Sequence, residues 1–347
     1  MFNPINAEQE QQLRALIHEH ELGAAEDLIL SWAQCAIVLE MAPVGQGNAG
    51  RSRLGGLPDV PAGWQWPEGL TFLGQIDLKA MANYDQNKVL PASGILLFFI
   101  NDYGWDKLGL PGRIQYIIDA PDGTSELLPA RAPHDYLPMS LCAGGDGREV
   151  YNARDIVARS IISLPAVYTR QWETLEEVDS PEVDMTDAYS NLLGALNSRR
   201  HHQLLGHHAF MDGNADEEAW SATNGVPIQL IGKEVSPEER EKTLQRLEES
   251  ANHYEMKLPE ETDPLLRESA ERMVRYYQDE REAYLRYLEQ KDQTDAQLSE
   301  WVLLLQMDSD DDLGTMFNDA GFAYFMTRRS DLATARFDRV YASLWSS

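Results

Sequence analysis

The stretch that decides the fold is Leu70-Thr-Phe-Leu-Gly-Gln-Ile-Asp77, an apolar run that ends in Gln-x-Asp. A Gly-containing turn, Leu54-Gly-Gly-Leu-Pro58, comes shortly before it. The same order recurs in the second half, where Leu204-Leu-Gly-His-His208 precedes Trp301-Val-Leu-Leu-Leu-Gln-Met-Asp308. Apolar runs of this length, bounded by turn residues, are typical of buried strands. The sequence therefore predicts two diverged copies of one strand-containing unit.

A second pair of apolar runs agrees with this interpretation. Gly94-Ile-Leu-Leu-Phe-Phe-Ile100 and Gly321-Phe-Ala-Tyr-Phe-Met326 both open with Gly and are rich in aromatic residues. They predict two more buried strands, one in each copy. Two further strands are predicted at 35–39 and 114–118.

The remaining segments indicate helices and a boundary. Asn6 with Gln9 forms a capping box for a helix, and a second helix is predicted at about 24–32. An acidic connection at 173–187, without Lys or Arg, is the predicted seam between an N-terminal half (1–172) and a C-terminal half (188–347). Apolar residues at helical spacing predict a helical-hairpin insertion at 236–291.

The charge restricts the partners. The 29 basic and 57 acidic residues give a net charge of -28. Nucleic acid and anionic membrane surfaces repel such a chain, whereas a basic protein attracts it.

Only Cys35 and Cys142 are present, so neither a disulfide framework nor a Cys-based metal cage is expected. No stretch of about 18 uncharged apolar residues occurs. We expect a cytoplasmic protein that has no nucleic-acid or membrane partner.

The ordered motifs resemble the YwqG-like family of bacterial proteins, a domain of unknown function. The residues that carry the resemblance are Arg53-Leu-Gly-Gly-Leu-Pro58, Trp66-Pro67, Leu73-Gly-Gln-Ile-Asp77, Leu90-Pro91 with 94–100, Ser163-Leu-Pro165, His202-Gln-Leu-Leu-Gly206, Leu305-Gln-Met-Asp-Ser-Asp310 and Asp319-Ala-Gly-Phe-Ala-Tyr-Phe325. The resemblance implies an α+β fold with duplicated, mainly antiparallel β-sheets. It implies no established activity. Some members lie in bacterial toxin-immunity neighbourhoods, which implies a protein-binding role.

Imidazole and carboxylate groups offer one metal-binding alternative. His201, His202, His207 and His208 lie within eight residues, and His202 and His208 with Asp308 and Asp310 are the metal candidates. Adjacent His residues on extended chain point to opposite faces, which argues against a shared site. The segment from Asp308 to Asp312 also resembles the front of a calcium loop, but Leu313 takes the position at which an EF-hand needs Gly.

The repeated polar pairs offer a second alternative. Gln75 with Asp77, and Gln306 with Asp308, either satisfy backbone groups inside the fold or, together with His202, line a ligand cleft. No phosphate loop, nucleophile elbow or other complete catalytic set is present, and no cofactor is expected. The sequence therefore predicts a non-enzymatic binding protein for a basic partner protein, and the resemblance implies that it is an immunity-type or interaction protein. The alternative is a small-ligand-binding protein or a metal-dependent enzyme that uses the His202/Asp308 region.

Overall fold

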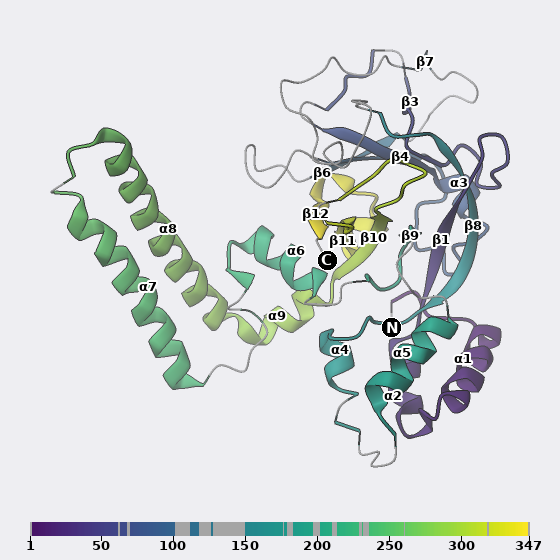
Figure 1. Cartoon of the computed structure of the whole chain (residues 1–347), viewed down its shortest axis with the longest axis horizontal. Coiled ribbons are helices and arrows are strands. Elements are labelled where there is room, and N and C mark those ends of the chain that lie inside the picture. The colour runs from purple at the N-terminus through teal and green to yellow at the C-terminus, as the bar shows by residue number, and fades with distance from the viewer. Residues whose placement is uncertain are drawn as a thin grey trace. The chain divides into compact units, whose positions relative to one another are not determined.

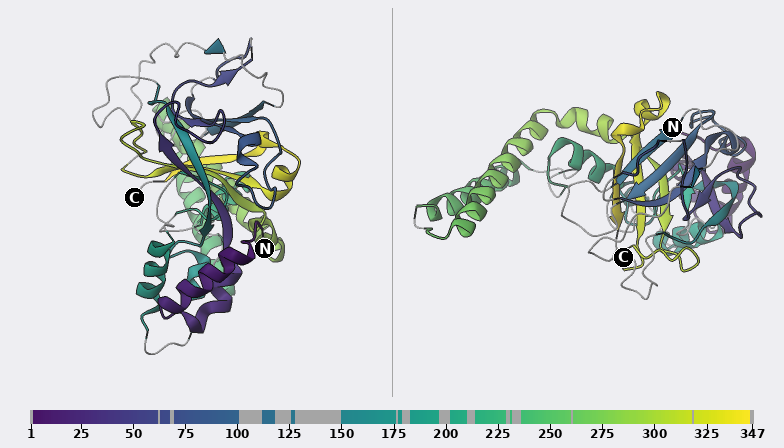
Figure 2. Two further views of the ribbon diagram at one scale, coloured as in Figure 1. Left: turned by 90° about the vertical axis from the view of Figure 1, so that its right-hand side faces the viewer. Right: turned by 90° about the horizontal axis from the view of Figure 1, so that it is seen from above.

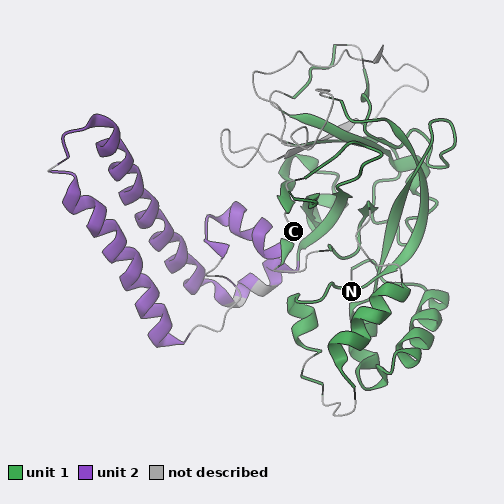
Figure 3. Ribbon diagram, in the orientation of Figure 1, with its two compact units in different colours: residues 1–215, 300–347 green, residues 216–299 purple. Residues whose placement is uncertain are grey.

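The computed structural model describes residues 2–61, 63–67, 70–100, 112–117, 126–127, 150–175, 177–178, 183–196, 202–209, 214–228, 231, 236–259, 261–317 and 319–345 (Figure 1). The chain forms two compact units, one from residues 1–215 with 300–347 and the other from residues 216–299 (Figure 3). Because the second unit interrupts the first in sequence, the first unit is closed by strands from both ends of the chain.

The centre of the first unit is a long antiparallel strand pair. β1 (Gln34–Ala42) pairs with β8 (Arg154–Ser163) along its whole length, from Gln34 opposite Ser163 to Ala42 opposite Asp155. Figure 2 shows the two strands running side by side. All other strands of the main sheet are added to the outer edges of this pair.

Each edge of the pair carries four strands in the same succession. A two-residue strand comes first, and three longer strands follow it in chain order. Beside β8 lie β2 (Arg53–Leu54), β4 (Thr71–Asp77), β5 (Ile95–Ile100) and β6 (Gly112–Ile117). Beside β1 lie β9 (Gln203–Leu204), β10 (Trp301–Asp308), β11 (Phe322–Arg328) and β12 (Tyr341–Trp345). A separate two-stranded sheet is formed by β3 (Asp59–Val60) and β7 (Glu126–Leu127).

The ten-stranded sheet curls until its two end strands, β6 and β12, approach each other. Side chains from the inner face of both sets of strands fill the space that the sheet encloses, among them Leu54, Phe98, Leu204 and Phe325. The rings of Phe98 and Phe325 meet edge to face at 5.1 Å between centroids. The interior is thus one continuous apolar core, to which both sets of strands contribute.

β5 shows why a strand of this sheet can have an unbroken apolar sequence. Leu96, Phe98 and Ile100 belong to the enclosed core, whereas Leu97 and Phe99 belong to a second cluster on the outer face. Trp64 stacks on Phe99 in that outer cluster, with ring centroids 5.9 Å apart. A strand that is buried on both faces needs apolar residues at every position, so its sequence shows no alternation.

Four helices of the first unit share a smaller core. They are α1 (Ala7–Glu19), α2 (Glu26–Trp32), α4 (Arg170–Glu173) and α5 (Met185–Ala195). Leu13, Ile29, Trp172 and Tyr189 are buried among them. α1 begins with the expected capping box, in which the Asn6 side chain accepts from the backbone of Gln9 and the Gln9 side chain accepts from the backbone of Asn6. The described part of the unit contains four further short helices: η1 (Gly23–Ala25), α3 (Leu78–Met81), α10 (Arg329–Ala333) and η4 (Phe337–Arg339).

The second unit is entirely helical in its described part. It contains α6 (Ala215–Asn224, from Asp216 onward), α7 (Pro237–Lys257), α8 (Pro264–Glu289) and α9 (Lys291–Leu298). Ser236 and Glu239 form the capping box of α7, and the Asp263 carboxylate caps α8. α7 and α8 pack against each other within the range 236–291, for which a helical hairpin is predicted. Among the described helices of the whole chain, none is long and apolar enough to cross a membrane.

The α+β class with a mainly antiparallel sheet is confirmed. β8 and β12 are not among the predicted strands. The acidic stretch at 173–187 was expected to be a connection, yet α4 ends within it and α5 begins within it. The Asp184 carboxylate caps α5, which accounts for one of its acids.

Candidate functional site

Gln75 lies in the core of the first unit with no exposed surface. Its Nε2 group donates to the Arg51 carbonyl at 2.7 Å and to an Asp59 carboxylate oxygen at 2.9 Å. Its Oε1 atom accepts the backbone N–H of Asp59 at 2.8 Å. A buried amide must find partners for its polar atoms, and this one finds three within the protein.

Asp59 links Gln75 to a buried ion pair. Arg53 donates to both oxygens of the Asp59 carboxylate, at 2.7 and 3.1 Å. Burial by itself raises the pKa of Asp59, but the hydrogen bonds from Arg53 and Gln75 outweigh it and lower the pKa below its usual value. Arg53 also donates from Nε to the Leu57 carbonyl at 3.1 Å. The network fixes the turn between β2 and β3.

Asp77 serves as a helix cap. One of its oxygens accepts from the backbone N–H groups of Lys79 and Ala80 at the start of α3, and the other accepts from Arg51 at 3.2 Å. Its own N–H donates to the Ser52 hydroxyl at 2.8 Å. Both oxygens of this candidate ligand group are thus engaged by backbone donors.

Gln306 occupies the corresponding place in the other set of strands. Its Oε1 atom accepts the backbone N–H of Ala209 at 2.9 Å, and its Nε2 group donates to Asp308 at 3.1 Å. The Asp308 N–H donates to Nδ1 of His202 at 3.0 Å. Because Nδ1 accepts this bond, a neutral His202 ring carries its proton on Nε2.

His202 faces the acidic turn that follows β10. Its Nε2 atom lies 3.8 Å from the Asp310 carboxylate. This interaction lowers the pKa of Asp310, and the N–H groups of Leu313 and Asp312 lower it further against the opposing effect of burial. His202 is buried, with 6% of its surface exposed, so the pair lies at the edge of the core.

The acidic turn is held by its own hydrogen bonds. Asp310 Oδ1 accepts from the N–H groups of Asp312 and Leu313, at 2.8 and 3.3 Å. The backbones of Asp310 and Thr315 exchange two bonds of 3.0 Å. Asp311 and Asp312 remain exposed to solvent. In a calcium loop the Asp310 carboxylate would point toward the ion. Here it accepts backbone N–H groups of its own turn, which makes this an Asx-type turn.

The turn also connects the two sets of strands. The Asn152 N–H donates to the Leu313 carbonyl at 2.8 Å, and the Asn152 side chain donates to the Asp312 carbonyl at 3.0 Å. On the other side of Asn152 lies Gly55, where a Cβ atom would come within 2.1 Å of the Asn152 carbonyl oxygen. Gly55 has a φ of +64°, so both its conformation and this close approach require glycine.

The other imidazoles point elsewhere. His207 Nε2 lies 2.8 Å from the Trp32 carbonyl, and His208 Nε2 accepts the Ala215 N–H at 3.4 Å. Burial lowers the pKa of His207 to about 4 and that of His208 to about 3. Both rings are therefore neutral at pH 7. His201 lies outside the described residues.

The geometry brings together some of the predicted site residues and not others. Gln306, Asp308, His202 and Asp310 form one chain of contacts, whereas Gln75 and Asp77 belong to the Arg53–Asp59 network. In the described part of the chain, no three His, Cys, Asp or Glu side chains are grouped so that they could hold a metal ion. The ligand-binding role of Gln75, Asp77, His202, Gln306 and Asp308 stays a prediction.

Sequence analysis missed the role of Arg53 and Asp59 in this network. Arg53 enters it only as part of a motif that carries the family resemblance, and Asp59 does not enter it. An Arg and an Asp six residues apart across a Gly-Gly turn are the available signal, but such spacing is common in loops without an ion pair. Only the pairing of β2 with β4, which places Arg53 opposite Gln75, reveals the connection.

The comparisons with known proteins give a family and no activity. No curated protein matches the chain. One family model, described as "Domain of unknown function (DUF1963)", matches residues 52–345, which cover both sets of strands and the helical unit that follows β9 and precedes β10 in the chain. The chain therefore belongs to the DUF1963 family, a domain of unknown function.

Proposed function

We propose that this chain is a non-enzymatic binding protein of the YwqG-like type, which acts in the manner of an immunity protein on a basic partner protein. The observation that carries the proposal is the excess of 57 acidic over 29 basic residues. Acidic residues outnumber basic ones in both compact units. A negative surface of this kind speeds the encounter with a basic protein and disfavours acidic ones.

Exposed carboxylates stand at two described places, and one of them, Asp312, lies 3.8 Å from the Arg154 guanidinium. Asp311 and Asp312 stand on the turn that Asp310 fixes, and Glu173 and Asp187 lie at the ends of the acidic stretch. Charges on a fixed turn lose little conformational freedom when a partner binds, which favours affinity. The turn at 308–312 is thus the first surface to test.

The polar network inside the fold supports the same proposal. The side chains of Gln75, Asp77 and Gln306 form hydrogen bonds with backbone groups and with neighbouring side chains. Such groups stabilise a scaffold, whereas a catalytic group must remain able to reach a substrate.

One observation favours the alternative of a ligand or metal site. His202 Nε2 and the Asp310 carboxylate lie 3.8 Å apart, and imidazole with carboxylate suits zinc, manganese or iron. Nδ1 of His202 accepts the Asp308 N–H, so only Nε2 is left for a ligand. Elemental analysis of the purified protein tests this alternative, because a metal enzyme would carry a stoichiometric transition metal.

The binding proposal is tested with the full chain as bait. A tagged protein is incubated with lysate of its native host at about 50 mM salt, and captured proteins are identified. Binding of the purified partner is then measured between about 50 and 500 mM salt. We expect a basic partner whose association rate falls steeply with salt, because salt screens surface charges over about 8 Å at physiological ionic strength.

Charge-neutral variants locate the contact. Asp311→Asn with Asp312→Asn removes two charges from the turn, and Asp279→Asn with Glu289→Gln removes two exposed charges from α8 as a matched control. We expect the turn variant to slow association several-fold and the α8 variant to leave it nearly unchanged. A captured partner that is acidic, or a binding constant that is indifferent to salt, would refute the proposal and favour the small-ligand alternative.

A further inference from the structure

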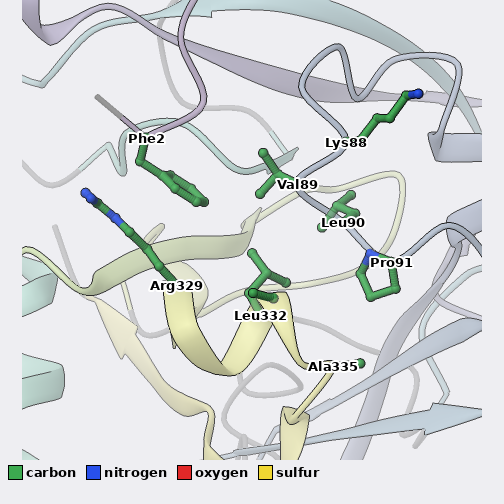
Figure 4. A pocket seen from close by; sticks show the side chains of 9 residues that line it. Phe2, Lys88, Val89, Leu90, Pro91, Arg329, Leu332 and Ala335 are labelled. Carbon is green, nitrogen blue, oxygen red and sulfur yellow. The ribbon is translucent and has the colours of Figure 1, made fainter.

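A cavity of about 370 Å³ lies in the first unit where three separate segments meet. Phe2 comes from the N-terminal segment, residues 88–91 come from the loop after α3, and the third wall is α10 with Ala335. Figure 4 shows Phe2, Val89 and Leu332 turned toward one another. The volume is within the range that holds a small molecule.

Hydrogen bonds hold the first two walls in place. The Asn3 side chain donates to the Cys35 carbonyl at 2.6 Å, which ties the N-terminal segment to β1. Asn87 donates to the Asn3 side chain at 2.8 Å, and the Leu90 N–H donates to the buried Asp85 carboxylate at 2.7 Å. The loop and the N-terminal segment are thus fixed to each other.

The third wall is fixed by the backbone of Glu300, which belongs to the first unit, and by the enclosed core. The Arg329 N–H donates to the Glu300 carbonyl at 2.8 Å, and Leu332 belongs to the enclosed apolar core. Val89 and Phe2 pack against the same core. The cavity is therefore preformed, so a ligand would lose little free energy in ordering its walls.

The cavity carries positive charge in a strongly negative protein. Lys88 and Arg329 are among its lining residues, and neither forms an ion pair with any described residue. The Arg329 guanidinium lies over the Phe2 ring, 4.9 Å from its centroid, and its Nε atom is buried without a hydrogen-bond partner in the described part of the chain. A buried donor without a partner is costly, and a ligand that accepts from it would remove that cost.

Each neighbouring acid has one carboxylate oxygen engaged by another group. Glu300 Oε2 accepts the Ser330 N–H at 3.4 Å, and Asp331 Oδ1 lies 3.7 Å from Arg339. Asp331 Oδ2 is buried without a hydrogen-bond partner among the described residues, and neither acid forms an ion pair with Arg329 there, whose guanidinium faces the apolar ring of Phe2. The site combines an apolar body with a cation that is suited to a planar anion.

We propose that this cavity binds a small amphipathic carboxylate, with its apolar body against Phe2, Val89 and Leu332 and its carboxylate on Arg329. The Arg329 fork matches the two oxygens of a carboxylate, and Lys88 adds a second positive charge at the rim. The net charge of -28 disfavours small anions over the molecule as a whole, so an anion needs local cations to bind, and among the described residues neither Lys88 nor Arg329 has an ion-pair partner. The site is separate from the acidic turn and goes beyond the proposed protein-binding function.

The test is calorimetric titration of the full chain with octanoate below its micellar range. 1-Octanol, which has the same chain and no charge, is the matched ligand. We expect one saturable site for octanoate and at least about tenfold weaker binding of 1-octanol, because a hydrogen bond to a charged group discriminates by about that factor or more. Arg329→Gln should weaken octanoate by a similar factor.

Two further variants make the result decisive. Arg328→Gln is the matched control, because the neighbouring guanidinium lies over Trp301 at 4.9 Å and does not line the cavity; its affinity should stay within about twofold of the wild type. Ala333→Phe enlarges an exposed lining residue and should abolish binding without entering the core. If Arg329→Gln fails to fold in a thermal melt, Ala333→Phe decides the question. The proposal is overturned if octanoate shows no saturable binding, if 1-octanol binds equally well, or if Ala333→Phe still binds.

Discussion

At the scale of single residues, burial decides what an ion pair contributes. Arg53–Asp59 and Arg159–Glu40 have the same shortest distance, 2.7 Å. The Arg53 and Asp59 side chains are 19% and 11% exposed, whereas those of Arg159 and Glu40 are 46% and 50% exposed. Water screens the second pair and competes for its hydrogen bonds, but it cannot replace a lost partner in the first.

We therefore expect Asp59→Ala to lower the free energy of unfolding by about 3–5 kcal/mol, because it leaves the Arg53 guanidinium buried without its carboxylate. It also removes an acceptor of the buried Gln75 amide. Glu40→Ala, the matched control, should cost less than about 1 kcal/mol. Urea denaturation of the two variants measures both values. Equal effects would mean that the Arg53–Asp59 pair is as well solvated as the surface pair.

The residue scale also shows what the sequence could and could not predict about the site. Gln75 and Gln306 were singled out because they repeat, and both prove to be buried and hydrogen-bonded to backbone. The cavity could not be predicted, because Phe2, Val89 and Leu332 are ordinary apolar residues that lie far apart in the chain. Only the fold brings these side chains together, and no local sequence pattern indicates that they line one cavity.

At the scale of elements, the two sets of strands correspond in detail. β2 places Arg53 opposite Gln75, and β9 places Gln203 opposite Gln306. Both β4–β5 and β10–β11 contain a register shift, between Phe72 and Gly74 in one and between Leu303 and Leu305 in the other. Gln203 donates to the carbonyl of the residue four positions on, as Arg53 does. The internal duplication stays a prediction, and these correspondences support it.

Elements differed in how readily their sequences predicted them. β4, β5, β10 and β11 are buried along nearly their whole length, so each reads as an apolar run. β8 mixes buried and partly exposed positions and contains Arg and Asp side chains, which hides it from a search for apolar runs. β2 and β9 contain two residues each, and the adjacent glycine turns were their only signal.

The helical hairpin leads to a prediction at this scale. Glu248 and Arg281 face each other across α7 and α8 at 3.8 Å, so a short Gly-rich linker can replace residues 248–281. The part of α8 that is retained includes Tyr287, whose ring contacts Trp220 within the same unit. We expect the first unit to keep its thermal midpoint within a few degrees, because it has its own core.

The matched comparison is a change in a strand of the sheet. Leu304 in β10 is fully buried in the enclosed core, and Leu304→Ala should lower the free energy of unfolding by about 2–5 kcal/mol. Circular dichroism melts of the hairpin deletion and of Leu304→Ala compare the two changes directly. A deletion that is more damaging than Leu304→Ala would mean that the hairpin is required for the first unit to fold.

At the scale of the whole molecule, acidity acts on stability through two groups of side chains in different pH ranges. The pKa values of His207 and His208 lie near 4 and 3 in the folded chain, below the value of about 6.5 for an unfolded His. The unfolded chain therefore binds protons first as the pH falls, and stability is lost below about pH 6.5. Asp59 and Asp310 have lowered pKa values, so their stabilising effect is lost only below about pH 4.

Between about pH 7.5 and 5.5 most carboxylates stay ionised, so relief of the repulsion among the acidic side chains is small in this range and the His rings dominate. As the pH falls from about 7.5 to 5.5, each of the two His residues should lower the free energy of unfolding by about 1.4 kcal/mol, because it gains a proton in the unfolded state alone. The double variant His207→Gln, His208→Gln keeps polar side chains that do not titrate, so its stability should be nearly flat over the same range. Urea denaturation at constant ionic strength measures both slopes. A wild-type protein as insensitive to pH as the double variant would show that the two rings accept protons in the folded state and that the surrounding protein does not hold them neutral.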